Sequence, residues 1–378
     1  MSINAGKKEF IKLLGINFSI LIILLSFPAL FYRFYTTIKN TINGTLNQTL
    51  DQRAFYPTYE NKKFAIDVLN ESSKTTTNYK SFIGWRRGKV NLKYTNILGP
   101  YNTRKSQGEE IDNSVWFFGG STMWGTGASD SQTIPSHFHS LTSMPVYNFG
   151  ESGWNSRQSL NQLINTIGDS YKPSKVIFFD GVNDVAGQCR REFKLLPIHN
   201  REVIVQTALK QNKIQSYLKF IISPYIAIAK KFNVKLSINN YGNLNEFDCN
   251  TNKVKARLIA RHLVNNWRTA YLLSKYNGIE FYGILQPTIY TTTTNSEYFT
   301  SADRRFYQLE SQYNTVYPLI LQEIKRQCKS DQEFCSSMIN GKDWLDGTNN
   351  IFIDFCHVNS LGNEIIAKRI KSLLKNEN

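Results

Sequence analysis

Cysteine and histidine are scarce in this chain, which has five of each among its 378 residues. No Cys-x-x-Cys pair occurs, so the sequence lacks the ligand spacing of a structural zinc site and we expect no metal. Five cysteines are too few for a disulfide scaffold, although one or two bridges can form outside the cytoplasm. Cys328 and Cys335 are close enough in sequence to pair, while Cys189 and Cys356 lie shortly after the candidate site residues Asn183 and Asp354 and could meet near the site. The connectivity itself does not follow from the sequence.

Acidic residues are in the minority, at 29 against 45 lysines and arginines, which gives a formal net charge of +16. Such a charge favours an acidic partner, of which nucleic acid is the usual first candidate. The membrane topology that the N-terminus predicts removes most of the chain from nucleic acid, so we expect no such partner. A basic stretch between Arg190 and Lys235, interleaved with aromatic and aliphatic residues, fits a surface for anionic lipid or acidic glycan. A solvated face on an insertion is the favoured interpretation of the same stretch.

Long hydrophobic runs are absent except for one near the N-terminus. Leu13 to Tyr32 holds no charged residue over 20 positions, enough to cross a hydrocarbon core of about 30 Å. Lysines before it predict a cytoplasmic N-terminus by the positive-inside rule. We therefore expect a cytoplasmic segment at 1–12, a transmembrane anchor at 13–35 and the remainder outside the cytoplasm, in the periplasm of a bacterium as first choice. The alternatives are a cleaved signal peptide, whose apolar part usually spans about 7–15 residues, and a buried core helix.

Two regions of different pattern follow the apolar run. Residues 36–112 are polar, with scattered apolar positions, which predicts a stem or linker whose apolar island Ser81–Arg86 docks on the next domain. From 113 to 378, apolar strands alternate with helices, which predicts an α/β domain with a parallel sheet covered on both faces. Connections near 188–251 and 286–303 are too long for simple loops and are expected to be insertions. The expected strands are 115–118, 146–149, 175–179, 279–285 and 351–353, and the expected helices are 156–168, 253–276, 304–326 and 360–374.

Four short polar motifs stand at or just past the ends of expected strands. They are Gly119-Gly120-Ser121-Thr122, Asn148-Phe149-Gly150-Glu151-Ser152-Gly153, Gly181-Val182-Asn183-Asp184 and Asp354-Phe355-Cys356-His357. The carboxyl ends of parallel strands share one edge of the sheet, where the active sites of this architecture lie. A serine hydroxyl is a weak nucleophile that needs an imidazole to take its proton and a carboxylate to orient that imidazole. Ser121, His357 and Asp354 therefore predict a catalytic triad.

The four motifs, in this order, resemble the blocks of the SGNH hydrolases, also called GDSL-type esterases. The resemblance runs from about Val115 to the C-terminus and implies a flavodoxin-like three-layer α/β/α sandwich. An α/β-hydrolase nucleophile elbow is disfavoured, because it would need glycine where Met123 stands. The first block, Gly-Gly-Ser-Thr, departs from Gly-Asp-Ser-Leu by lacking the acidic neighbour of the serine. In this it is similar to exported or membrane-tethered bacterial members of the superfamily.

The resemblance also implies roles for individual residues. Ser121 would be the nucleophile, and its N–H would form an oxyanion hole with the Gly153 N–H and the Asn183 side-chain amide. Gly153 lies five residues after Asn148, as the family spacing has it, and Gly150 is the alternative donor. The neighbouring Asp184 and Cys356 are interpreted as structural: the carboxylate orients its loop, and the serine pattern leaves no need for the thiol.

The function that the resemblance implies is a membrane-anchored serine esterase. It would remove O-acyl groups, O-acetyl first, from an envelope or extracellular carbohydrate through an acyl-serine intermediate, without a cofactor. The alternatives are an O-acyltransferase in surface polysaccharide modification, a lipid esterase and a catalytically silent glycan-binding module. The expected partners are an O-acylated carbohydrate or another ester and the membrane, and the sequence predicts no oligomeric state.

Overall fold

The computed structural model divides the chain into two compact units. One comprises Met1–Thr49 and Val203–Tyr241, and the other comprises Leu50–Glu202 and Gly242–Asn378. The residues that the structure describes are 3–46, 51–99, 101–109, 112–168, 172–191, 246–294, 297–299 and 307–375.

The first unit contributes one described element, the 44-residue helix α1 (Ile3–Leu46). Its large apolar side chains are exposed, with Phe18, Ile23 and Phe27 each more than 60% accessible. Within the described residues, no helix combines the length and the apolar character that a membrane crossing requires. The transmembrane anchor expected at 13–35 is therefore not supported by the structure.

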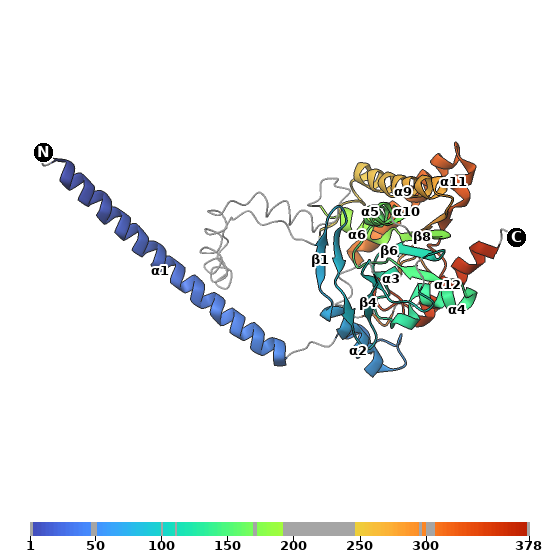
Figure 1. The fold of residues 1–378 in the computed structure, drawn as a ribbon, viewed down its shortest axis with the longest axis horizontal. Coiled ribbons are helices and arrows are strands. Elements are labelled where there is room, and N and C mark those ends of the chain that lie inside the picture. The colour runs from blue at the N-terminus through green and yellow to red at the C-terminus, as the bar shows by residue number, and fades with distance from the viewer. Residues whose placement is uncertain are drawn as a thin grey trace. The chain divides into compact units, whose positions relative to one another are not determined.

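The second unit is built around five parallel strands. Their spatial order is β10-β9-β8-β6-β7, and three further strands continue the sheet beyond β7. Figure 1 shows β6 and β8 side by side in this sheet. Every residue of β6 and all but the first of β8 are buried, as expected for strands covered on both faces. The parallel strands are β6 (Val115–Gly119), β7 (Val146–Asn148), β8 (Lys175–Asp180), β9 (Glu280–Leu285) and β10 (Met338–Asn340).

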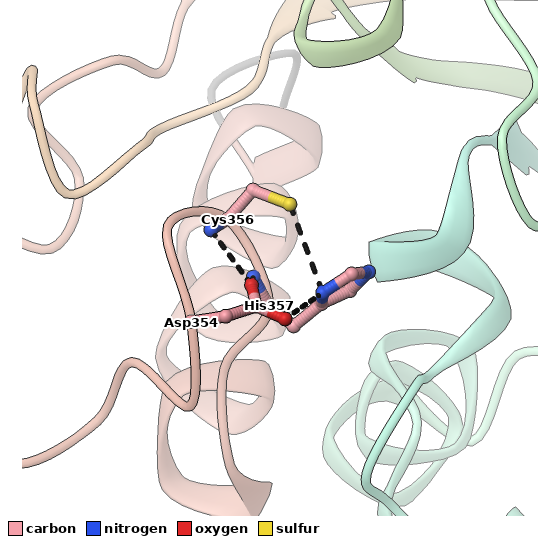
Figure 2. A group of neighbouring side chains, drawn as sticks. All are labelled: Asp354, Cys356 and His357. Carbon is pink, nitrogen blue, oxygen red and sulfur yellow. Dashed lines mark hydrogen bonds and ion pairs between the residues drawn. The ribbon is translucent and has the colours of Figure 1, made fainter. Parts of the chain in front are cut away.

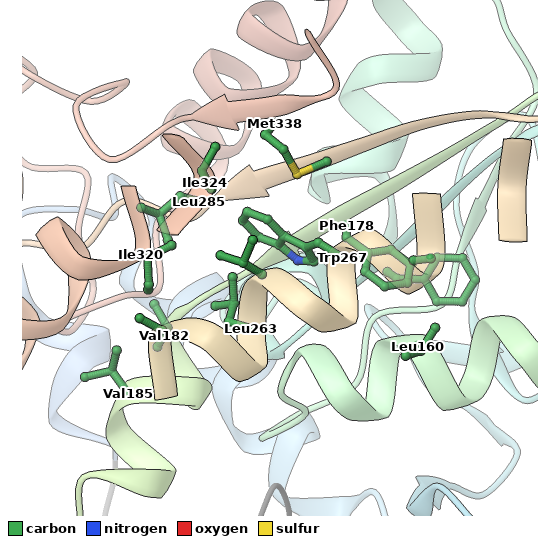
Figure 3. Packing of buried hydrophobic residues seen from close by; sticks show 14 of the residues in the cluster. Leu160, Phe178, Val182, Val185, Leu263, Trp267, Leu285, Ile320, Ile324 and Met338 are labelled. Carbon is green, nitrogen blue, oxygen red and sulfur yellow. The ribbon is translucent and has the colours of Figure 1, made fainter. Parts of the chain in front are cut away.

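Helices cover both faces of this sheet, which makes the three-layer α/β/α arrangement that we expected. One face packs against α5 (Ser156–Ile167), α6 (Val182–Gln188), α9 (Lys253–Tyr276) and α10 (Tyr307–Cys328). The other packs against α4 (Ile134–Thr142) and α12 (Ser360–Lys375). Figure 3 shows Trp267 of α9 and Phe178 of β8 in the first of these cores. Gly283 makes room for that indole, because a Cβ there would lie 2.8 Å from the ring.

The fifth parallel strand differs from our expectation. We expected it at 351–353, but β10 occupies that place beside β9. Residues 351–358 instead fold back on themselves, with a bridge between Phe352 and Val358 and a hydrogen bond from the Ile353 N–H to the His357 carbonyl of 2.9 Å. The apolar run at 351–353 is buried because it supports this loop, and not because it pairs along the sheet.

Residues 51–109 also differ from the linker expected at 36–112, because they form part of the second unit. Three of their strands extend the main sheet, since β5 pairs antiparallel with β7 and continues through β4 to β3. These strands are two or three residues long, too short to produce the alternation by which strands are recognised. The elements are η1 (Gln52–Phe55), α2 (Lys62–Lys74), the hairpin β1 (Thr77–Lys80) and β2 (Gly84–Arg87), then β3 (Val90–Asn91), β4 (Asn96–Leu98) and β5 (Thr103–Arg104).

Two disulfides join cysteines of the second unit. Cys328 pairs with Cys335, as their spacing allowed. Cys189 pairs with Cys249 and not near Cys356, which is free and buried. Cys189 pairs with Cys249 because the segment that leads into α9 contacts the end of α6: the Asp248 N–H donates to the Cys189 carbonyl at 2.9 Å. The two ends of the insertion expected at 188–251 therefore lie side by side. Residues 192–245 of that insertion, and with them most of the basic stretch 190–235, lie outside the described residues.

Candidate active site

The candidate nucleophile lies where β6 ends and a short helix begins. Ser121 is the first residue of α3 (Ser121–Trp124), which ends at Gly125 in the left-handed region, with φ 94°. The buried guanidinium of Arg104 holds this end of the helix by donating to the carbonyls of Trp124 at 3.0 Å and Gly125 at 2.6 Å. A further bond to the Ala128 carbonyl of 2.6 Å extends the clamp. The end of the short helix that carries Ser121 is thus held by the Arg104 side chain.

The structure brings Ser121, His357 and Asp354 into one hydrogen-bonded row. The Ser121 Oγ lies 2.6 Å from His357 Nε2, and His357 Nδ1 lies 2.6 Å from Asp354 Oδ2. The other carboxylate oxygen accepts the N–H groups of His357 at 2.9 Å and Cys356 at 3.0 Å, which fixes the loop (Figure 2). With its proton on Nδ1, the imidazole donates to Asp354 and accepts from the serine hydroxyl. This arrangement can take a proton from Ser121.

A residue that the sequence did not point to completes this row. Arg53, on η1, donates from a terminal guanidinium nitrogen to Asp354 Oδ2 at 2.8 Å. Burial alone would raise the pKa of Asp354, but attraction to His357 and Arg53 and the hydrogen bonds from His357 hold it well below its usual range. Arg53 precedes Asp354 by 301 residues, and no motif surrounds it. The sequence therefore gave no signal by which it could have been found.

Asn183 lies at the second position of α6, with its amide close to the nucleophile helix. Its Nδ2 donates to the Trp154 carbonyl at 2.7 Å. A Cβ on Gly120 would lie 2.4 Å from the same Nδ2, so the glycine before Ser121 is what allows the amide to approach. The amide nitrogen has a second hydrogen, which is available to a ligand.

The two candidate glycines of the second motif differ in what their N–H groups contact. The Gly150 N–H donates to Asn148 Oδ1 at 2.9 Å, and a Cβ there would lie 2.4 Å from the Trp124 nitrogen. Gly150 therefore serves close packing against α3. Among the described residues, neither the Gly153 N–H nor the Ser121 N–H donates to a protein acceptor. Of the two glycines, Gly153, with φ 77°, is therefore the one whose N–H group is available to bind a ligand.

The hairpin β1–β2 braces the loop that carries Gly153. The Trp85 indole donates to the Ser152 carbonyl at 3.0 Å, and the Trp154 indole donates back to the Trp85 carbonyl at 3.0 Å. Arg87 forms a buried ion pair with Glu151, and its N–H donates to the same carboxylate at 2.8 Å. The expectation that the island Ser81–Arg86 docks on the domain is confirmed by these contacts.

Asp184 is buried beside Asn183 and holds the start of α5. It accepts the Ser156 hydroxyl at 2.5 Å and the Ser156 N–H at 3.2 Å. Burial raises the pKa of Asp184, and burial together with repulsion from Asp184 raises that of the neighbouring Asp180. The carboxylate of Asp184 thus orients the loop, as expected, and faces no described group of the row Ser121–His357–Asp354.

Asp354, Cys356 and His357 also form a group whose potential ligand atoms lie within 4.8 Å of one another. Two of these atoms, Asp354 Oδ2 and His357 Nδ1, already share a hydrogen bond, which a bound cation would have to break. The Cys356 Sγ lies 3.7 Å from His357 Nδ1 (Figure 2). Burial, followed by the charge of Asp354, raises the pKa of its thiol well above the usual range, so the thiolate that a metal or a substrate would need is disfavoured.

Comparison with known proteins identifies a family that resembles the chain. The model of the GDSL-like lipase/acylhydrolase family matches residues 115–370, which is most of the chain. No curated protein matches the chain. Among solved structures, a GDSL-like lipase from Bacteroides thetaiotaomicron is 14% identical, with a TM-score of 0.35 over 70% of this chain and 89% of that one. An acetyl xylan esterase from the rumen bacterium Butyrivibrio proteoclasticus is 12% identical, with a TM-score of 0.36 over 71% and 64%. At such scores these structures carry no information about the substrate.

Proposed function

This chain belongs to the GDSL-like lipase/acylhydrolase family and is a carboxylic ester hydrolase, and on that premise we propose that it removes O-acyl groups from carbohydrate. The observation that carries the proposal is the row Ser121–His357–Asp354, with 2.6 Å at each of its two hydrogen bonds. We assign Ser121 as nucleophile, His357 as general base and Asp354 as the group that orients the imidazole.

The proposed reaction proceeds in two acyl transfers. His357 Nε2 takes the Ser121 proton as Oγ attacks the ester carbonyl, and then gives that proton to the departing sugar oxygen. The acyl-serine that results is cleaved by water, which His357 deprotonates in the same way. Asp354 stabilises the imidazolium in both steps, since its carboxylate stays ionised at working pH.

The oxyanion of each tetrahedral intermediate requires donors that the resting protein leaves unused. We assign the N–H groups of Ser121 and Gly153 and the second amide hydrogen of Asn183 to this role. Loss of one such donor typically costs about 10²–10³ in rate. Gly150 is not assigned, because its N–H is already bound by Asn148.

The carbohydrate part of the proposal draws on a cavity of about 630 Å³ that includes Asn359 and Ser360, two and three residues past His357, and whose lining contains none of Ser121, Asp354 and His357. Its lining is rich in amides and aromatic edges, which suit sugar hydroxyls and ring faces better than a long acyl chain. The amide side chains are Gln132, Asn61, Asn349, Asn350 and Asn359, and the rings are those of Tyr59, Phe64 and Tyr94.

The location that we propose is outside the cytoplasm, attached to a membrane through α1. Two disulfides favour an oxidising compartment. The uncharged run from Leu13 to Tyr32 and its exposed apolar side chains favour attachment. Alkaline carbonate extraction of the full chain, compared with a chain starting at residue 51, tests this: release of the full chain into the soluble fraction would contradict it.

The reaction is tested by acetate release from an O-acetylated polysaccharide, using the chain from residue 51 and its Ser121→Ala variant. We expect release by the first and none by the second. Acyl transfer to an added sugar instead of to water would identify an O-acyltransferase. Preference for long-chain p-nitrophenyl esters over acetate esters would identify a lipid esterase. A folded protein that cleaves no ester and does not react with a fluorophosphonate would leave only the binding module.

A further inference from the structure

A second hydrogen bond joins the nucleophile helix α3 to the loop 351–358, next to the bond between Ser121 and His357. The Thr122 hydroxyl, one residue after Ser121, donates to the carbonyl of Cys356, one residue before His357, at 3.1 Å. Thr122 and Cys356 are both buried. Two adjacent pairs of residues are thus joined by two hydrogen bonds, and the proposed reaction uses only the one from Ser121 Oγ to His357 Nε2.

Gln286, the residue after β9, joins this contact from a third element. Its Nε2 donates to Thr122 Oγ1 at 2.6 Å and to the Cys356 carbonyl at 3.4 Å. A hydroxyl has one proton and two lone pairs, so the Thr122 hydroxyl can donate to the carbonyl while it accepts from the amide. The link Gln286–Thr122–Cys356 is therefore a row in which each group donates to the next.

The backbone of Gln286 is fixed by two neighbouring elements. Its N–H donates to the carbonyl of Asp180, the last residue of β8, at 2.9 Å, and its own carbonyl accepts the Tyr317 hydroxyl of α10 at 2.8 Å. The same segment reaches the loop a second time, because the Ile289 N–H donates to the Phe355 carbonyl at 3.0 Å. The carboxyl end of the sheet thus holds both the link and the loop that carries His357.

The distance between Ser121 and His357 decides whether a proton can pass between them. A general base must lie within hydrogen-bond reach of the proton that it takes, and a displacement of 1 Å can cost about 10²-fold in rate. Thr122 also stands where the motif Gly-Asp-Ser-Leu has leucine, which has no hydroxyl. A chain with leucine at this position could not form the link.

We propose that Thr122 and Gln286 are positioning residues, which hold the loop 351–358 at the distance at which the His357 imidazole can take the Ser121 proton. The inference deepens the proposed function and rests on it for the roles of Ser121 and His357. If Thr122 only filled space, a side chain of the same shape would replace it without loss of rate. In the positioning role the hydroxyl is what matters, so its removal lowers the rate and its return restores the rate.

The experiment measures the second-order rate of fluorophosphonate labelling at Ser121 in the full chain in non-ionic detergent, with Ser121→Ala as the blank. We expect Thr122→Val, which keeps the shape but removes the hydroxyl, to lower the rate about 10- to 100-fold. Thr122→Ser, which keeps the hydroxyl, should restore most of the rate. Gln286→Met should also be slower than the wild type. The double variant Thr122→Val/Gln286→Met should be little slower than Thr122→Val, because the link acts as one unit.

Thr166→Val is the matched control. Thr166 is buried in α5, where its hydroxyl donates to the Gln162 carbonyl at 2.7 Å and accepts from the Gln162 amide at 2.8 Å. The control therefore loses a carbonyl contact and an amide contact, as Thr122→Val does. Its melting temperature should fall by a similar amount, while its labelling rate stays at that of the wild type.

A wild-type rate in Thr122→Val, a Thr122→Ser rate as low as that of Thr122→Val, or an equal loss in Thr166→Val would each overturn the inference. If labelling follows the expected pattern while the wild type releases no acetate from O-acetylated polysaccharide, the inference stands and the proposed function fails. Acetate release without that pattern has the opposite meaning. A wild type that is not labelled at all overturns the inference, because it has no activated serine to position. Should Thr122→Val not fold, Gln286→Met decides: a slower rate supports the inference, and a wild-type rate overturns it.

Discussion

Gly120→Ala is expected to abolish most activity by displacing one side chain. Gly120 has φ −79° and ψ −156°, an extended conformation outside the left-handed region that favours glycine. Its new Cβ would lie 2.4 Å from Asn183 Nδ2 and 3.2 Å from the Trp154 carbonyl. Real Cβ atoms do not approach so closely, so the amide must withdraw from its place beside Ser121.

The size of the effect follows from what the amide does. If Asn183 donates to the oxyanion, its withdrawal should lower kcat/KM by about 10²–10³, or about 2.7–4 kcal/mol of transition-state stabilisation. The resting protein loses only the hydrogen bond to Trp154, worth about 1 kcal/mol. For a unit of this size the melting temperature should fall by no more than about 2–4 °C. The variant should therefore be folded and nearly inactive.

The assay is kcat/KM for p-nitrophenyl acetate in a double-mutant cycle with Asn183→Ala. Once the amide is gone, the Cβ at position 120 keeps only the 3.2 Å contact with the Trp154 carbonyl, so the double variant should be little slower than Asn183→Ala alone. Gly187→Ala is the control, because Gly187 lies in α6, the helix that carries Asn183, and a Cβ at Gly187 would meet nothing within 4 Å. Losses that multiply in the double variant, or a Gly120→Ala rate within threefold of wild type, would refute the oxyanion role of Asn183.

Three further predictions concern stability. Burial raises the pKa of Glu109 from 4.5 to about 7. The folded protein therefore holds the Glu109 proton to a higher pH than the unfolded chain does, and the wild type loses stability as the pH rises from 4.5 to about 7. Glu109→Gln should accordingly raise the melting temperature at pH 8 but not at pH 4. Breaking Cys189–Cys249, which closes 60 residues, by Cys→Ser at both positions should destabilise the unit by about 4 kcal/mol in urea unfolding. A chain of residues 113–378 should fail to fold cooperatively by circular dichroism, because β5 and its neighbours would leave the β7 edge unpaired.

The sequence predicted that Ser121, His357 and Asp354 lie together because its signals are local. Each motif follows an apolar strand, and the order of those strands in a parallel sheet brings their ends to one edge. The observed β6 and β8 begin at the expected residues, 115 and 175, and each is followed by its motif. The choice between Gly150 and Gly153 was open in the sequence because both are glycines of one loop. The choice depends on a single hydrogen bond, from the Gly150 N–H to Asn148 Oδ1, which only coordinates can show.

What the sequence did not predict depends on contacts between distant residues. The strands β3 to β5 have two or three residues each and form only because β7 offers an edge. The strand expected at 351–353 was apolar and short like a true strand, but its burial comes from the loop that it supports. The partner of Cys189 likewise depends on where α9 begins, which lies beyond an insertion that the sequence alone does not place.

The segment before the family match supplies arginines to two of the four motifs and to the end of α3, and these contacts tie it to the second unit. Arg53 reaches Asp354, Arg87 reaches Glu151 in the second motif, and Arg104 reaches the carbonyls at the end of α3. A guanidinium suits this task because its five donors can satisfy carboxylates and carbonyls that would otherwise be buried without partners. Removing one of these arginines leaves such acceptors unpaired, which costs more than the contact itself contributes. On the proposed function, the four motifs supply the reacting groups, while arginines outside the region that the family model matches hold those groups in place.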